Sequence, residues 1–176
     1  MNKLSFAVGS AYTALLAFII VCIDQTIKCF MPIGAQTGFT YIAFVAWSVY
    51  FFSGCTLKGG IRAAIGYVIG VSFSIVIWEL AGVFGAADGN FVAVPLAVSF
   101  VVFLVLYLEK AAPWFDLIPA MFVASGCFFG IMNYVPGAQD AICSAATVEL
   151  IYGFIGLTFG WITITGKGIF EKMIKK

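Results

Sequence analysis

Six apolar runs, each long enough to cross much of a bilayer, dominate this sequence and constrain its fold more than any other feature. A membrane-spanning helix needs about 20 mostly apolar residues. The runs cover residues 6–23, 39–57, 63–87, 91–108, 117–135 and 141–165, and the breaks cover residues 24–34, 58–60, 88–90, 109–116 and 136–140. The breaks mix charged residues with Gly or Pro, which is typical of loops. The sequence therefore predicts an all-α polytopic membrane protein with six transmembrane helices.

The scarcity of charge supports this interpretation. Of the 176 residues, 63% are apolar and 10% are charged, whereas a soluble domain has about 25% charged residues. The mean hydropathy of +1.11 exceeds what one soluble core can bury, because most residues of a small domain lie near its surface. We therefore expect the lipid bilayer to cover a single transmembrane domain, 1–176. A net charge of +1 provides no basic field for nucleic acid.

The distribution of Lys and Arg predicts the orientation of the bundle. With the N-terminus inside, Lys28 is the one basic residue outside, and the cytoplasmic segments contain Lys3, Lys58, Arg62, Lys110, Lys167, Lys172, Lys175 and Lys176. Basic residues favour the cytoplasmic side. We therefore expect a bacterial inner-membrane protein with both termini in the cytoplasm. The basic tail at 167–176 is interpreted as an anchor on anionic headgroups.

An even number of spans permits two halves of three, 1–88 and 89–168, related as an inverted repeat. Such repeats build many transporters, with the solute path near their interface. Phe-Val-Ala occurs at both 44–46 and 122–124, and Ser-Gly-Cys occurs at both 53–55 and 125–127. These matches require different registers, and the low complexity of membrane helices also produces such matches by chance. The repeat is therefore left open.

Two carboxylates, Glu79 and Glu149, lie inside predicted spans. A charge at the centre of a bilayer costs about 2.5–3.5 kcal/mol on insertion scales. No Lys or Arg at the same depth is available to neutralise them, so protonation, water or a bound cation is needed. We expect both glutamates at one outer vestibule of a solute pathway. The alternative is a side chain that reaches the headgroups or bonds to a neighbouring hydroxyl.

Glycine stripes mark three of the predicted helices. Glu149 shares a helix face with one of them, and the full set is Gly66, Gly70, Gly126, Gly130, Gly153, Gly156 and Gly160. Glycines let helices approach closely, so we expect these faces to be buried in protein. Tight packing without a solute role is the simpler interpretation of the stripes. Asn133 continues the second stripe, and its amide can offer hydrogen bonds to a solute.

Aromatic residues make up 17% of the chain, and several lie in the middle of predicted spans. Apolar constrictions can exclude ions by dewetting. We therefore expect a constriction near Trp47, Phe51, Phe52, Phe128 and Phe129, with lipid-facing bulk as the alternative. The other aromatic residues assigned to the pathway are Tyr50, Trp78 and Tyr152.

The residues that usually carry catalysis or bind metals are sparse. The chain has no histidine, and its five cysteines form no CxxC pair, so we expect no metal site. Phosphate-binding loops and nucleotide-binding fingerprints are also missing from the sequence, so we expect no cofactor and no enzyme activity. Cys29 and Cys143 both fall near the outer face, where a disulfide between them is conceivable.

One block of sequence resembles a known family. Residues 44–59 read FVAWSVYFFSGCTLKG, and residues 119–130 run from PAMF to GCFFG. These segments resemble the YcdZ-like proteins, a bacterial inner-membrane family of unknown function, although Cys55 stands where we expect glycine. The resemblance implies a small polytopic channel or transporter and transfers no active site. The layout is also similar to small six-helix urea, amide and acetate channels, which assemble as rings of protomers.

Together these patterns favour a homo-oligomeric membrane channel or facilitator. Its small-molecule solute is expected to be neutral and compact, such as an amide, alcohol, aldehyde or protonated short acid. Acidic outer groups and the absence of cations from the spans argue against bare anions. Two alternatives remain: a proton-coupled secondary transporter that uses Glu149, and a non-transporting scaffold or assembly partner.

Overall fold

A computed structural model describes residues 3–34 and 37–174, and all regular structure in these ranges is helical. The helices are α1 (Lys3–Ile27), α2 (Thr40–Phe52), α3 (Leu57–Val83), α4 (Ala93–Leu108), α5 (Ile118–Tyr134) and α6 (Ile142–Ile174), with a short 3-10 helix η1 (Lys28–Phe30) after α1. Each predicted apolar run overlaps one of the six α-helices. The predicted all-α fold class is therefore confirmed.

The six helices fall into two groups by length. The stretches Phe6–Phe30, Leu57–Val83 and Ile142–Phe170 are long and apolar enough to cross a membrane. Helices α2, α4 and α5 are also apolar, but they have 13, 16 and 17 residues, fewer than the roughly 20 needed to span a bilayer core. Three candidate spans are therefore found, in α1, α3 and α6.

The predicted break at residues 58–60 is wrong, because these residues form the first turn of α3. The Thr56 hydroxyl accepts a hydrogen bond from the Gly59 amide at 3.0 Å and thereby caps the helix. The chain reverses just before this cap, at Gly54 and Cys55, whose φ angles are +96° and +57°. A good cap allowed the helix to begin earlier than its glycine-rich sequence indicated.

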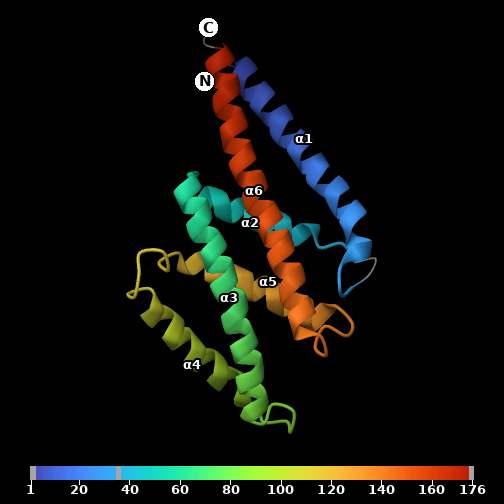
Figure 1. The fold of residues 1–176 in the computed structure, drawn as a ribbon, viewed down its shortest axis with the longest axis vertical. Helices are drawn as coiled ribbons and strands as arrows, with labels where there is room; N and C mark the ends of the chain where they lie inside the picture. Colours follow the sequence, from blue (N-terminus) through green and yellow to red (C-terminus); the bar gives the residue numbers. More distant parts are fainter. Residues whose placement is uncertain (1–2, 35–36, 175–176) are drawn as a thin grey trace.

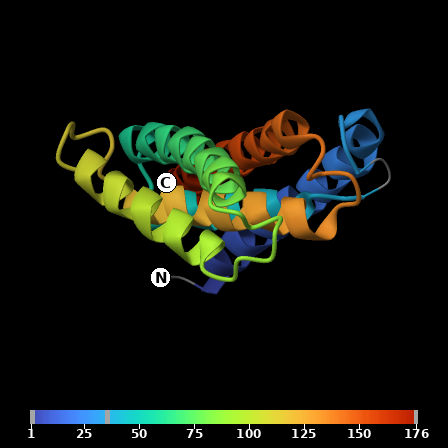
Figure 2. The ribbon, with the colours of Figure 1, turned by 90° about the horizontal axis from the view of Figure 1, so that it is seen from below.

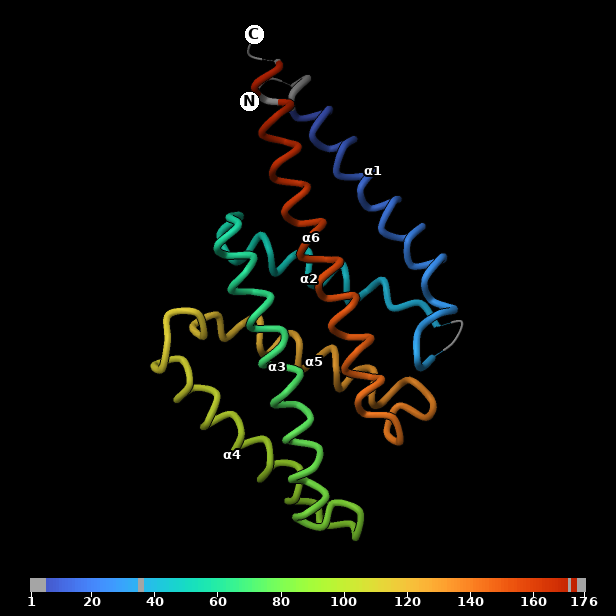
Figure 3. The backbone as a smooth tube through the Cα atoms, viewed as in Figure 1, coloured from blue at the N-terminus to red at the C-terminus, as the bar shows by residue number. Residues whose placement is uncertain are grey.

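Two long helices, α3 and α6, form the centre of the arrangement, and each is crossed by a short helix. Helix α2 packs across α6, and α5 packs across α3, as Figure 3 shows. Helix α1 lies along α6, and α4 lies along α3. In Figure 1 the start of α1 and the end of α6 lie at the same end of the molecule.

The core lies between these layers. In Figure 2, α3 and α6 lie to one side of the molecule, and α4 and α5 lie to the other. The main buried cluster contains large aromatic residues from four elements, among them Phe39, Tyr50, Tyr67, Phe128 and Tyr152. A smaller cluster joins α3, α4 and α5 through Ile77, Ala97, Val101, Val105 and Met121.

Glycine makes both helix crossings possible. A Cβ atom on Gly70 of α3 would overlap the backbone of Met121 in α5, and a Cβ on Gly156 of α6 would overlap the backbone of Ala43 in α2. Real side chains do not tolerate such overlap, so the crossings depend on these two positions.

The remaining glycines of the stripes differ in how closely other atoms approach them. A Cβ would meet Ala120 at Gly66, Tyr67 at Gly153 and Tyr50 at Gly160. At Gly130 it would lie at an ordinary 3.6 Å from the Tyr41 hydroxyl. Gly126 has open space beside it, so no helix approaches closely there.

Candidate functional site

The most unusual group in the structure is the carboxylate of Glu149, in the third turn of α6. Its side chain is completely buried, with 0% exposure. Neither carboxylate oxygen has a hydrogen-bond partner. Buried polar groups are nearly always satisfied, and a buried charge without a partner is very costly. This carboxylate is therefore the strongest candidate for a functional group.

Titratable side chains from three other helices lie close enough to Glu149 to feel its charge. Tyr41 of α2, Tyr67 of α3 and Cys127 of α5 all lie within electrostatic reach of its carboxylate. The Tyr67 ring packs against Gly153, one helical turn after Glu149. The Tyr67 hydroxyl is also buried without a partner. We call these four side chains, Glu149, Tyr41, Tyr67 and Cys127, the Glu149 site.

No cation among the described residues pairs with Glu149. In the part of the chain that the structure describes, the one ion pair joins Arg62 to Asp116, which lies in the loop between α4 and α5. A carboxylate ion without a counter-ion at this burial is too costly to persist. An ionised Glu149 would therefore need a counter-ion from outside the described residues, whereas a protonated Glu149 would need none.

A second buried carboxylate, Asp24, fastens three helices together. It is 2% exposed, near the end of α1. Its Oδ1 accepts hydrogen bonds from the Tyr152 hydroxyl of α6 at 2.7 Å and from the Phe39 amide at the start of α2 at 3.0 Å. Tyr152 lies three residues after Glu149, a spacing that makes them neighbours on one helix face. Tyr152, which the sequence assigned to a predicted solute pathway, thus links the Glu149 site to the Asp24 contact.

The two glutamates of the predicted vestibule lie in different environments. Glu79 is exposed on α3, whereas Glu149 is enclosed. The structure therefore does not bring them together in one enclosed site. Asn133 is also exposed, and its side-chain amide donates to the Phe129 carbonyl of its own helix at 2.7 Å.

The aromatic residues of the predicted pathway differ in how far they are buried. Trp47, Tyr50 and Phe128 are buried in the main core, whereas Phe51 and Phe52 are 38% and 70% exposed. Phe129 and Trp78 are half-buried. The Trp47 ring packs against Phe159 at 5.9 Å between centroids, and its indole nitrogen has no partner.

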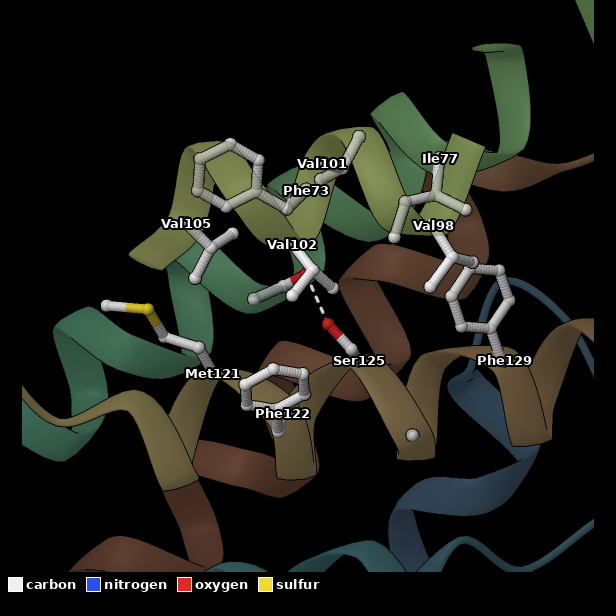
Figure 4. A pocket seen from close by; sticks show the side chains of 12 residues that line it. Phe73, Ile77, Val98, Val101, Val102, Val105, Met121, Phe122, Ser125 and Phe129 are labelled. Carbon is white, nitrogen blue, oxygen red and sulfur yellow. Dashed lines mark hydrogen bonds between the residues drawn. The ribbon is translucent and has the colours of Figure 1, made fainter. Parts of the chain in front are cut away.

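A cavity of about 290 Å³ lies between α3, α4 and α5 (Figure 4). Its walls are almost wholly apolar and include Val102, Phe122 and Phe129. The Ser125 hydroxyl is used in a 3.0 Å hydrogen bond to the Gly70 carbonyl. This cavity presents no charged group, so it offers nothing that would select a charged solute.

Within residues 3–34 and 37–174, no three His, Cys, Asp or Glu side chains gather as metal ligands. Cys29 and Cys143 are both exposed free thiols.

Sequence reasoning missed three members of the Glu149 site and underestimated Asp24. Tyr67 directly follows Gly66 in the glycine stripe, so its position beside a helix contact was open to inference. Tyr41 and Cys127 carry no comparable signal. Asp24 was assigned to a loop, but α1 continues to Ile27, which places this carboxylate inside a helix.

Comparison with known proteins adds a family. The model of a family described as proteins of unknown function matches residues 7–166 of the chain. No curated protein and no solved structure matches the chain. An uncharacterised family is thereby confirmed, whereas the more specific resemblance to the YcdZ-like proteins stays a prediction.

Proposed function

The chain belongs to the DUF1097 family of proteins of unknown function, and we propose from its geometry that it is a proton-coupled transporter of a small solute, with Glu149 as the proton carrier. One observation supports this most strongly: an ionisable side chain is fully buried in an apolar helix without any partner. Ionisable residues within membranes are expensive, and they typically mark ion or substrate pathways.

The same burial favours a gated transporter over a permanently open channel. An open pore past Glu149 would leave its carboxylate in contact with water, but the side chain is 0% exposed. The exposed positions of Phe51 and Phe52 also give little support to an aromatic constriction. An enclosed carboxylate suits an occluded state, which must open before a solute or a proton can leave.

The proposal includes a location and a topology. The protein lies in a bacterial inner membrane, with six transmembrane segments and both termini in the cytoplasm. The start of α1 and the end of α6 lie at one end of the molecule (Figure 1), which agrees with this topology. Helices α2, α4 and α5 cross part of the bilayer as helices, and the flanking chain completes each crossing.

The proposal also includes an inverted repeat that relates α1–α3 to α4–α6. Gly156 meets the backbone of Ala43, and Gly70 meets the backbone of Met121. Ala43 and Met121 are 78 positions apart, the same separation as the Phe-Val-Ala segments at 44–46 and 122–124. This agreement favours the Phe-Val-Ala register over the Ser-Gly-Cys register. In the proposed repeat, α3 and α6 lie at the interface of the two halves, where transporters bind solutes.

The test is coupled flux in proteoliposomes. Purified protein is reconstituted with an internal pH dye, and a panel of small amides, short acids, alcohols and amines is applied under a pH gradient. We expect at least one solute to move protons in the wild type. Glu149→Gln should abolish this coupled movement, because an amide cannot carry the proton.

A matched variant controls for loss of a carboxylate. Glu109→Gln removes an acidic group at the end of α4, away from the Glu149 site, and should keep wild-type flux. Solute flux that persists in Glu149→Gln without proton movement would indicate a passive channel instead. Absence of flux for every solute in the panel would contradict transport and leave a scaffold role.

A further inference from the structure

We propose that the Glu149 site binds the ammonium group of a small primary amine, which is exchanged for the proton on Glu149. This inference rests on the proposed transport function and deepens it by assigning a substrate class.

The number of unsatisfied acceptors matches an ammonium group. Three oxygen atoms of the site are buried without partners: the two carboxylate oxygens of Glu149 and the hydroxyl oxygen of Tyr67. A primary ammonium has three N–H donors and no acceptor. One bound ammonium would therefore satisfy all three oxygens, whereas a single protein donor would leave at least one unsatisfied.

The charge of the site also favours a cation. The groups that face Glu149 from the packed helices are Tyr41 of α2, Tyr67 of α3 and Cys127 of α5. From α1, Asp24 reaches α6 through Tyr152. All of these groups are neutral or acidic, so an ionised Glu149 needs its counter-ion from outside the protein.

A metal ion fits the same atoms poorly. Calcium and magnesium prefer six or more oxygen ligands, several of them carboxylates or carbonyls. The site has one carboxylate, one buried hydroxyl, a second tyrosine and a thiol, and no cluster of three potential metal ligands occurs in the described residues. Aromatic rings and a single carboxylate are better suited to an organic ammonium.

The packing limits the size of the amine. Glu149 is 0% exposed, so no water-sized space touches it in this conformation. Tyr67 already fills the space beside Gly153, since a Cβ there would lie 2.7 Å from its ring. We therefore expect the site to accept ammonium or methylammonium after a modest opening, and to reject bulky amines.

The exchange is balanced in charge and in protons. In the empty site Glu149 is a neutral carboxylic acid. When the ammonium enters, the carboxylic acid loses its proton to solvent, and the carboxylate pairs with the ammonium. One positive charge enters the site and one leaves, so the site stays neutral throughout. No oxidant, reductant or further reactant is required.

Binding by the full chain in detergent micelles tests the inference without a membrane that free amines could cross. Methylammonium chloride is titrated at neutral pH in weak buffer, with calorimetry for binding and a dye for released protons. We expect about one proton per bound methylammonium. Sodium chloride and tetramethylammonium chloride should release none, because neither cation has N–H donors.

Two variants separate the ammonium site from general effects. Glu149→Gln should abolish both binding and proton release, whereas Glu109→Gln should retain them. Tyr67→Phe removes one acceptor and should weaken methylammonium binding by about tenfold, in line with loss of one hydrogen bond to a charged group. The folded state of each variant is checked by its thermal unfolding.

The outcomes distinguish this inference from the transport proposal. Binding that is equal in Glu149→Gln, or binding without proton release, would overturn the ammonium site. Coupled flux with amides or acids, but none with methylammonium, would overturn the substrate class and leave the transporter standing. Loss of coupled flux for all solutes would remove both.

Discussion

The two helix crossings, α2 on α6 and α5 on α3, are built alike, but the outer helices beside them are held differently. In both crossings a glycine on a long helix meets the backbone of a short one, at Gly156 on Ala43 and at Gly70 on Met121. Helix α1 is fastened to α6 by polar contacts: the Tyr12 hydroxyl donates to the Ile162 carbonyl at 3.0 Å, and Asp24 accepts from Tyr152.

Helix α4 has no equivalent polar fastening in the described residues. It packs on α3 through small and branched side chains such as Ala97 and Val101, and the apolar cavity separates it from α5 (Figure 4). The crossing of α2 on α6, which lies beside the outer helix held by polar contacts, is also the one that adjoins the Glu149 site. Two similar helix crossings can therefore have different surroundings. The outer helix beside one crossing is held by polar contacts, whereas the outer helix beside the other borders an apolar cavity.

The largest expected effect tests whether the two crossings are equally necessary. Gly156→Leu should prevent folding, because its side chain would occupy the backbone position of Ala43. Overpacking a core by even a few methylenes costs about 1–3 kcal/mol, and displacement of a backbone costs more. Expression and thermal unfolding in detergent would measure the loss, and Gly70→Leu should behave in the same way.

Gly126→Leu is the control for this prediction. Gly126 is helical and exposed, with open space beside it, so a leucine there should be tolerated. Normal folding of Gly156→Leu would show that α2 can move away from α6, and would break the comparison of the two crossings.

Sequence alone was sufficient for the helices but not for the site. Apolar runs identified all six segments because length and hydropathy depend only on local residues. Burial of Glu149 and exposure of Glu79 depend on which helix faces which, and both glutamates follow apolar residues in similar helices. The turn at Cys55 had a signal only through the family resemblance, which implies glycine at this position, and the structure gives this residue a φ of +57°.

The site's other members could not be inferred, because they come from α2, α3 and α5 and meet only through packing. Tyr41 is 46% exposed, which a sequence pattern would assign to lipid contact alone. The stripe that contains Glu149 did identify the helix face that meets protein, through Gly153 and Gly156. Small residues in a helix indicate where another helix packs closely, but the sequence does not indicate which helix that is.

The second prediction concerns the buried fastening of α1. Asp24→Asn should destabilise the protein by about 1–3 kcal/mol, because an amide oxygen accepts more weakly and the amide nitrogen brings unsatisfied donors into a buried position. Thermal unfolding in detergent would show a lowered midpoint. Asp140→Asn, at an exposed loop position, should change it little. Equal effects of the two variants would show that the Asp24 contacts do not hold α1.

The third prediction concerns the turn that connects α2 to α3. Cys55 is the one non-glycine residue with a positive φ among the described residues, and this left-handed conformation costs a side chain about 1–2 kcal/mol. Cys55→Gly should therefore raise the unfolding midpoint modestly, since the flexibility of glycine in the unfolded chain offsets part of the gain. Cys55→Ala keeps the strained conformation and should give no gain. A rise in both variants would trace the effect to the thiol.

The smallest effect is expected at the ion pair between α3 and the loop before α5. Asp116 accepts a hydrogen bond from the Arg62 Nε at 2.9 Å, which connects the loop before α5 to the start of α3. This hydrogen bond, with the attraction of the guanidinium, lowers the pKa of Asp116 below its usual range. A carboxyl group with a lowered pKa in the folded state stabilises the protein above its ordinary pKa of about 4. That contribution is lost as the pH falls through the folded value.

The unfolding midpoint should therefore fall more steeply with acidification below about pH 4 in the wild type than in Asp116→Asn. Both proteins share every other carboxyl group, so the difference between their pH profiles isolates this pair. The pair is partly exposed, so 1 M salt should shrink the difference. Parallel pH profiles would show that the Arg62–Asp116 pair adds nothing to the packing of α3 against α5, which would widen the contrast with the crossing beside α1, where Asp24 fastens the helices.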